Sequence, residues 1–175
     1  SQALYVARRL QDLAEQSGQG MIMCFLDWEK AFDTVDQNRM MEALERLNIP
    51  EKVIGVIKAL YKEPTFKVAM RDEKSDYQVQ EAGIRQGCPL SPYLFILVMT
   101  VMFHDIYDRC SSRISYGKID GLAFAELLYA NDTLRAMNIL LAEIEKESAY
   151  YNLRLNKGKF NVISMNGNYD VRFPD

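Results

Sequence analysis

The stretch MIMCFLD, residues 21–27, is apolar at every position until it ends on Asp27. A continuous apolar run of this length is typical of a strand that is buried on both faces of a sheet. The sequence therefore predicts a central strand with a carboxylate at its C-terminal end. Two further runs, residues 121–129 and 156–165, predict additional strands.

Between these strands, apolar residues recur at helical spacing over much of the chain. The first helix carries apolar residues from Leu4 to Ala14 and ends at Gly18, a common helix stop. A pair of helices follows the first strand, and Asp36 caps the first of them, which stops before Pro50. The other predicted elements are the second helix of the pair over 53–60, a hairpin over 66–79 with its turn at 72–76, a buried helix over 93–103, a helix over 137–151 and a last hairpin strand over 169–173. This order predicts a single α+β domain.

The composition is that of an ordinary globular chain. Hydrophobic residues make up 49% of the 175 residues and charged residues 26%, and the net charge of −3 gives no general attraction to a polyanion. Any nucleic-acid contact must therefore use positive charge that is concentrated locally. Three widely spaced cysteines and one histidine provide no recognisable zinc site or disulfide framework, and they favour a reducing compartment.

Two features bear on location. The N-terminal residues lack the apolar core of a secretion signal, and the strongly apolar run over residues 93–103 is shorter than the about 20 residues that cross a membrane. We therefore expect an intracellular protein, in the nucleus or the cytoplasm, without a transmembrane segment or a membrane partner. The sequence predicts no oligomeric state.

Acidic and amide side chains follow two of the predicted strands. Asp27 ends the first strand, and Asn131 and Asp132 follow the run over 121–129, in the stretch LLYANDTL. Carboxylates at adjacent strand ends commonly hold Mg²⁺, which prefers oxygen ligands, and a pair of such ions is typical of phosphoryl transfer. Spacing alone leaves open the alternative that Asp27 is a cap and that Asn131 and Asp132 are turn residues.

Four motifs, taken together, resemble those of reverse transcriptases. FLDWEKAFDTVD (25–36), GIRQGCPLSPYLF (83–95), LLYANDTL (127–134) and LRLNKGK (153–159) follow the order and approximate spacing of motifs A, B, C and D of that family. The similarity is closest to the enzymes of non-LTR, LINE-type retrotransposons. It implies a polymerase palm, an antiparallel sheet packed on helices, with part of the fingers. Residues 1–175 would then be one reverse transcriptase domain fragment that lacks the N-terminal fingers and the C-terminal thumb.

The resemblance implies RNA-directed DNA synthesis with two Mg²⁺ ions, an RNA template, a DNA primer and deoxynucleoside triphosphates. Asp27, Asn131 and Asp132 match the metal-binding positions of motifs A and C, and the main chain at Trp28 would help to hold the triphosphate. Lys159 matches the motif D lysine that is proposed as general acid for the pyrophosphate leaving group. Its neighbour Lys157 is a competing candidate.

The resemblance also assigns residues to the nucleotide. Phe32 matches the bulky side chain under the sugar, where a ring excludes a 2′-hydroxyl and so selects deoxynucleotides. Gln86 and Gly87 match the motif B pair that lies against the incoming nucleotide and the template, and Arg85 is a candidate phosphate or template contact. The residue pattern by itself keeps the alternatives of a core aromatic for Phe32 and a solvated side chain for Arg85.

One position departs from the family pattern. Active members carry Asp where this chain has Asn131, so the predicted metal site loses a full negative charge. Only residues 134–137 separate Thr133 from the next predicted helix, which is a shorter segment than in the family. We therefore expect impaired catalysis. The alternatives are a non-catalytic remnant that at most binds nucleic acid or a protein partner, and a fragment that does not fold stably without fingers and thumb.

Overall fold

The computed structural model describes residues 2–18, 20–70, 73–80, 82–110, 127–130, 134–167 and 171. The chain divides into two compact units. The first, which we call the sheet unit, contains Ser1–Glu29, Met102–Tyr150 and Arg154–Asp175. The second, the helix-pair unit, contains Lys30–Val101 and Tyr151–Leu153. The single domain predicted over residues 1–175 stays a prediction.

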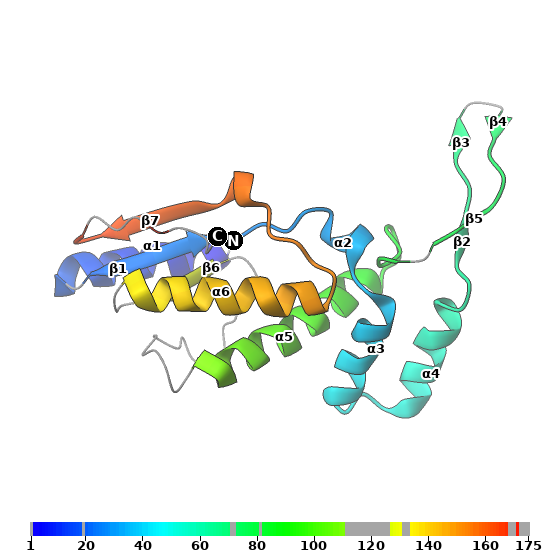
Figure 1. Ribbon diagram of the computed structural model, residues 1–175, viewed down its shortest axis with the longest axis horizontal. Helices are drawn as coiled ribbons and strands as arrows, with labels where there is room; N and C mark the ends of the chain where they lie inside the picture. The colour runs from blue at the N-terminus through cyan, green and yellow to red at the C-terminus, as the bar shows by residue number, and fades with distance from the viewer. Residues whose placement is uncertain are drawn as a thin grey trace. The chain divides into compact units, whose positions relative to one another are not determined.

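The sheet unit is built on an antiparallel sheet of three strands in the order β6-β1-β7. β1 (Met21–Phe25) is the central strand, and β6 (Leu127–Ala130) and β7 (Asn161–Met165) pair with it on either side (Figure 1). The first four residues of β1 are buried, as its continuous apolar sequence predicts. Burial also raises the pKa of the Cys24 thiol to about 12, because the thiolate would lose its solvation.

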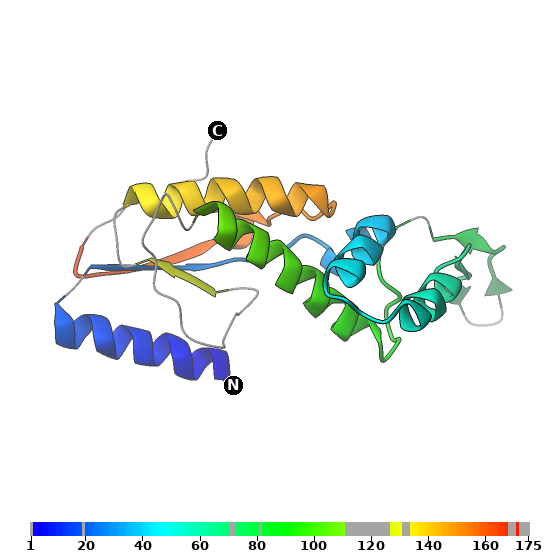
Figure 2. The ribbon, with the colours of Figure 1, turned by 90° about the horizontal axis from the view of Figure 1, so that it is seen from below.

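Helices lie on the two faces of this sheet, α1 (Gln2–Ser17) on one and α6 (Leu134–Tyr150) on the other (Figure 2). The contact of α1 with β1 is a cluster of buried side chains: Val6, Leu10, Ala14, Met21 and Met23. The buried apolar residues of α6 recur at helical spacing: Met137, Leu140, Leu141 and Ile144. The predicted α+β fold, with an antiparallel sheet packed on helices, is confirmed.

Three predicted boundaries in the sheet unit need correction or lie outside the described residues. The strand predicted from residue 156 begins only at Asn161, because Lys157–Lys159 form a short 3₁₀ helix, η1. The helix predicted from residue 137 begins at Leu134, so its first turn occupies the segment that we predicted as a linker. Of the strand predicted over 169–173, only Val171 lies within the described residues.

The helix-pair unit contains the two predicted helices, α3 (Gln37–Arg46) and α4 (Glu51–Leu60), after the short helix α2 (Ala31–Thr34). Asp36 caps α3 as predicted, because its Oδ1 accepts a hydrogen bond from the backbone N–H of Arg39 at 2.9 Å. The apolar residues that the two helices bury are Met40, Met41, Ala43 and Leu44 from α3 and Ile54 and Ile57 from α4.

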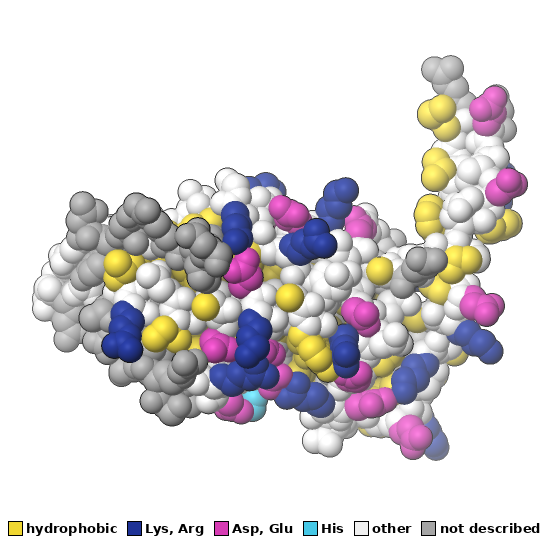
Figure 3. Space-filling model, viewed as in Figure 1, with side chains coloured by type: hydrophobic (Ala, Val, Ile, Leu, Met, Phe, Trp, Pro, Cys, Tyr) yellow, Lys and Arg dark blue, Asp and Glu magenta, His cyan; other side chains and the backbone are white. Residues whose placement is uncertain are grey.

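The predicted hairpin follows α4. Its inner strands are β2 (Thr65–Phe66) and β5 (Gln78–Val79), and its outer strands are β3 (Ala69–Met70) and β4 (Glu73–Lys74). β4 was predicted to be part of the turn, and that prediction is wrong because its two residues pair with β3. Every residue of these four strands is exposed, and hydrophobic side chains follow the hairpin (Figure 3).

The long helix α5 (Ser91–Cys110) buries one side only. Val98 and Met102 are fully buried, whereas Tyr93 and Ile96 are 66% and 58% exposed. The prediction that this helix is buried is therefore wrong for the side that carries Tyr93 and Ile96. A segment without charged residues can still expose large uncharged side chains to solvent. No helix in the described part of the chain has the length and hydrophobicity that a membrane crossing needs.

Candidate active site

Asp27 lies just beyond the C-terminal end of β1, where three contacts hold it. The Nζ of Lys159 is 3.0 Å from Asp27 Oδ2, and the side-chain amide of Asn156 donates to the same oxygen at 3.3 Å. The backbone N–H of Asn156 also donates to the carbonyl oxygen of Asp27 at 2.8 Å. The side chains of Asp27 and Lys159 are 38% and 70% exposed, so this ion pair is open to solvent.

Main-chain pairing brings the segment of Lys159 to the end of β1. The backbone N–H of Glu29 donates to the carbonyl of Arg154 at 2.8 Å, and Trp28 and Leu155 form an antiparallel bridge. The short helix η1 follows directly and carries Lys159. The motifs that resemble A and D are thus joined by backbone hydrogen bonds and by side chains.

Lys157 and Lys159, the two candidates for the general acid, have different ion-pair partners in the structure. The Nζ of Lys157 lies 3.0 Å from Oε1 of Glu145 on α6. Only Lys159 of the two is ion-paired with Asp27. The geometry therefore favours Lys159, and its role as an acid stays a prediction.

The indole of Trp28 is part of the core of the sheet unit. Trp28 is 7% exposed, its Nε1 donates to Ser148 Oγ at 3.2 Å, and its ring meets Phe103 edge-on with centroids 6.3 Å apart. The predicted contact of Trp28 with a triphosphate concerned its main chain and stays a prediction. The neighbouring N–H of Glu29 is occupied by the Arg154 carbonyl described above.

The predicted nucleotide-binding residues belong to the helix-pair unit. Phe32, on α2, stacks on Phe95 of α5 with ring centroids 5.0 Å apart and planes at 30°. The amide of Gln86 donates to Oδ1 of Asp33 at 2.6 Å. Phe32 is half-buried and packed on a neighbouring ring, which suits both a sugar contact and the core-aromatic alternative.

The loop before α5 is fixed to α2 by its main chain. The N–H of Ile84 donates to the carbonyl of Phe32 at 2.6 Å, and the N–H of Gly83 donates to that of Val35 at 2.8 Å. The backbone of Arg85 is held as well, because its carbonyl accepts a bond from Ser91 Oγ at 2.5 Å. The guanidinium of Arg85 has no partner among the described residues, so its predicted contact stays a prediction.

Two glycines of this loop have different reasons to be glycine. Gly87 has φ +82° with nothing within 4 Å of an added Cβ, so open space surrounds the residue predicted to face the nucleotide. Gly83 has φ +84°, and a Cβ there would lie 2.6 Å from the carbonyl oxygen of Asp33. Sequence reasoning missed Gly83, and the only signal for it was its place at the start of the predicted loop.

The structure describes β6 and not the residues that follow it. β6 runs antiparallel to β1 and ends with Ala130 opposite Ile22. Ile22 is five positions before Asp27, roughly 16 Å at about 3.3 Å per residue, so Ala130 lies beside the end of β1 that is farther from that carboxylate. Asn131 and Asp132 lie outside the described residues, and their place in a metal site stays a prediction.

Asp27 fits the chemistry of one metal ligand. Its Oδ2 already attracts the ammonium of Lys159, and no described residue bonds its Oδ1. A carboxylate oxygen is the kind of ligand that Mg²⁺ prefers. Within the described ranges, no group of three or more His, Cys, Asp or Glu side chains could hold a metal, so Asp27 is the one predicted ligand on which the fit can be judged.

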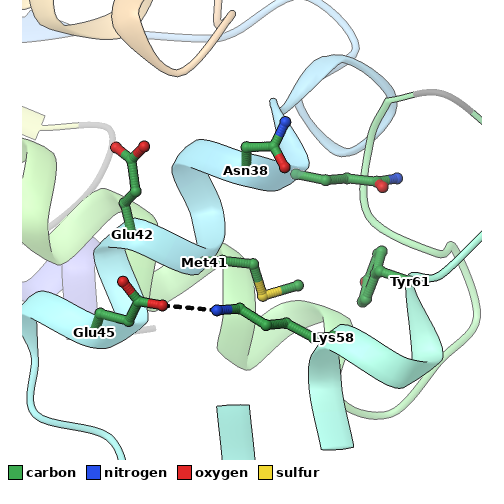
Figure 4. A pocket seen from close by; sticks show the side chains of 7 residues that line it. Asn38, Met41, Glu42, Glu45, Lys58 and Tyr61 are labelled. Carbon is green, nitrogen blue, oxygen red and sulfur yellow. Dashed lines mark hydrogen bonds and ion pairs between the residues drawn. The ribbon is translucent and has the colours of Figure 1, made fainter. Parts of the chain in front are cut away.

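A second lysine–carboxylate pair provides a contrast in the helix-pair unit (Figure 4). The Nζ of Lys58 lies 2.8 Å from Oε1 of Glu45, with side chains 53% and 54% exposed. The pair lines a pocket of about 280 Å³ whose other lining residues are Gln37, Asn38, Met41, Glu42 and Tyr61. None of the predicted site residues lines this pocket.

One protein family matches almost the whole chain. The family model described as "Reverse transcriptase (RNA-dependent DNA polymerase)" matches residues 2–172. Among individual proteins, the chain is 30% identical over 155 residues to the "Retrovirus-related Pol polyprotein from type-1 retrotransposable element R2" of Popillia japonica. It is 26% identical over 147 residues to the protein of the same description from Nasonia vitripennis.

These matches cover most of this chain and a small part of the relatives. They include 85% of this chain and 22% of the Popillia japonica protein, and 83% of this chain and 14% of the Nasonia vitripennis protein. Among solved structures, an apo telomerase from Candida tropicalis, truncated from its C-terminal domain, superposes with a TM-score of 0.65 at 14% identity. That match covers 97% of this chain and 36% of the telomerase chain, and it shows a shared fold.

Proposed function

This chain belongs to the reverse transcriptase family, the RNA-dependent DNA polymerases, and from that premise we propose that it is the palm of a longer enzyme that copies RNA into DNA. The predicted relationship to non-LTR reverse transcriptases is confirmed by the R2 relatives. The substrates would be an RNA template, a DNA primer and deoxynucleoside triphosphates. The observation that carries the proposal is the ion pair between Asp27 and Lys159, which match the family's metal ligand and general acid.

The reaction would be in-line attack of the primer 3′-hydroxyl on the α-phosphate of the nucleotide. Bound Mg²⁺ would supply positive charge for the phosphoryl group and for the attacking and leaving oxygens. Asp27 would hold that charge at the end of β1. Lys159 would give a proton to the departing pyrophosphate oxygen, which requires a protonated and mobile amine.

The helix-pair unit would supply the nucleotide contacts. The Phe32 ring would exclude a 2′-hydroxyl, and its stacking on Phe95 supports this role because a steric gate must not yield. Gln86 would approach the nucleotide from a loop whose neighbouring backbone is hydrogen-bonded to α2. The open space at Gly87 leaves room for a ligand at that point of the loop.

Asn131 would lower the rate of nucleotide addition by this chain. An amide oxygen can still coordinate Mg²⁺, but it brings no negative charge to the site. A charge pair at 4 Å is worth about 4 kcal/mol at an effective dielectric of about 20. If about 3 kcal/mol of that is lost in the transition state, the rate falls by roughly a hundredfold.

Primer extension on an RNA template tests both parts of the proposal. The longer protein that contains this chain would be compared with its Asn131→Asp variant in Mg²⁺, and the variant is expected to extend the primer about a hundredfold faster. Robust Mg²⁺-dependent extension by the unaltered protein would refute the impairment. Absence of extension by Asn131→Asp would contradict the polymerase assignment itself.

A binding module without catalysis is the second candidate, and two observations favour it. Ala130, the last residue of β6, pairs with Ile22 near the start of β1, and the hairpin exposes apolar side chains, with Val68 and Met70 60% and 71% exposed. Thermal unfolding during a Mg²⁺ titration separates the candidates. A working metal site gives saturable stabilisation, since a ligand that binds only the folded state raises its stability, whereas a module without the site gives none.

A further inference from the structure

The carboxylate of Asp27 is contacted on one of its two oxygens by described residues. Lys159 Nζ and Asn156 Nδ2 both bind its Oδ2, at 3.0 Å and 3.3 Å, and among the described residues nothing bonds Oδ1. We propose that the ammonium of Lys159 is a resident cation of this carboxylate which a divalent cation displaces, and that Asn156 is a positioning residue that keeps Asp27 in place during the exchange. The proposal rests on the proposed function for the metal-binding role of Asp27.

The Lys159 ammonium and a divalent ion on the same carboxylate would repel each other because both are positively charged. A divalent ion bound to a carboxylate oxygen at about 2.1 Å would lie within a few ångströms of an ammonium on the same group, and the two would repel each other. Affinity changes are reciprocal, so Lys159 weakens the binding of the divalent ion by the factor by which that ion weakens the Lys159 contact. Binding of the ion therefore favours departure of Lys159.

The exposure of Lys159 makes this exchange easy. Its side chain is 70% exposed, and exposed ion pairs contribute little to stability. The ammonium can enter water by rotation of its own side chain, and no buried contact has to break. Once released, the Lys159 side chain is free to move near the site, as the proposed general acid must be.

Asn156 differs from Lys159 in its charge and in its backbone contact with Asp27. Its amide is neutral and does not repel an arriving cation, and its backbone N–H is bonded to the carbonyl of Asp27 at 2.8 Å. The next backbone bond of the same pairing, from Glu29 to Arg154, does not involve Lys159 either. Asn156 can thus keep one hydrogen bond on Oδ2 while Lys159 leaves.

The first test counts bound Mn²⁺ by electron paramagnetic resonance in the longer protein that contains this chain. Lys159→Met is expected to bind Mn²⁺ roughly two- to fivefold more tightly than the parent, the range that removal of one exposed ion pair supports. Lys58→Met is the matched control, because it removes a lysine from a similarly exposed pair with Glu45, and its affinity is expected to equal that of the parent. Asp27→Asn identifies the site by abolishing the gain in the Lys159→Met background.

The role of Asn156 has its own variant. Asn156→Ala is expected to weaken Mn²⁺ binding by roughly tenfold or more, as for loss of a hydrogen bond to a charged group, whatever its effect on the melting temperature. A variant that lowers the melting temperature and leaves Mn²⁺ affinity unchanged would show a purely structural role and refute the positioning claim.

The second measurement follows the lysines themselves. With ¹³C-methylated lysines, which keep their charge, the Lys159 signal is expected to move saturably as diamagnetic Mg²⁺ is added, and the Lys58 signal to stay. Mn²⁺ binding that depends on Asp27 with an unmoved Lys159 signal would overturn the proposal and leave the proposed metal site standing. Absence of any Asp27-dependent binding would overturn the proposal and count against the metal site too, whereas primer extension tests the polymerase assignment separately.

Discussion

Asp27 and the loop from Gly83 to Ser91 are both predicted to serve one reaction, yet the structure holds them in different ways. The carboxylate of Asp27 is fixed by side-chain contacts with an exposed lysine and an amide, and the main chain of Asp27 accepts a hydrogen bond from the N–H of Asn156. The loop is fixed by main-chain bonds to α2 and by the fully buried Ile84. The difference indicates that the Asp27 carboxylate can exchange a side-chain partner while its main chain stays paired, whereas the position of the loop depends on main-chain bonds to α2.

The largest expected effect separates Asp27 from an ordinary surface acid. Asp27→Asn in the longer protein carrying Asn131→Asp should lower Mg²⁺-dependent primer extension by at least about a hundredfold, because loss of a carboxylate removes roughly 3 kcal/mol or more of charge stabilisation. Glu45→Gln, at the other exposed lysine pair, should leave the rate unchanged. Equal rates for both variants would refute the special role of Asp27.

The next effect concerns the loop from Gly83 to Ser91. Gly83→Ala should lower the free energy of unfolding by roughly 2–4 kcal/mol, because it combines a positive φ with a backbone clash at 2.6 Å. Gly87→Ala has a similar φ and open surroundings, and it should cost only about 1 kcal/mol. Urea unfolding of both variants measures the difference, and equal losses would mean that the contact with the Asp33 carbonyl is not tight.

The smallest effect probes the support behind Phe32. Phe95→Leu should cost roughly 1 kcal/mol of stability through loss of ring stacking. If the stack also fixes the steric gate, discrimination between deoxynucleotides and ribonucleotides falls severalfold in the variant carrying Asn131→Asp. Unchanged discrimination would assign Phe95 to the core alone.

The sequence predicted the positions of helices and strands better than it predicted which of their faces are buried. The continuous apolar run of β1 identified the central strand, since such a run is typical of a strand that is covered on both faces. Asp36 identified the start of α3 through the chemistry of its cap. The one-sided burial of α5 could not be predicted, because the exposed Ile96 is as apolar as the residues that its other side buries.

The candidate site was predicted in part. Motif resemblance selected Asp27 and Lys159, which lie 132 positions apart, and the structure pairs their side chains. Asn156 lies in the stretch that resembles motif D, but the resemblance assigned it no role, because an asparagine before a turn is common for local reasons. Gly83 was missed for a related reason: its close approach to the Asp33 carbonyl depends on a distant segment of the chain.

Anomalous diffraction from crystals of the chain grown with Mn²⁺ tests the central claim most directly. The account predicts an anomalous peak at about 2.0–2.2 Å from a carboxylate oxygen of Asp27, with the Nζ of Lys159 no longer bonded to that carboxylate. The same map would locate Asn131 and Asp132 relative to the ion. A peak at another acidic cluster such as Glu42 and Glu45, with Lys159 still paired to Asp27, would contradict the account.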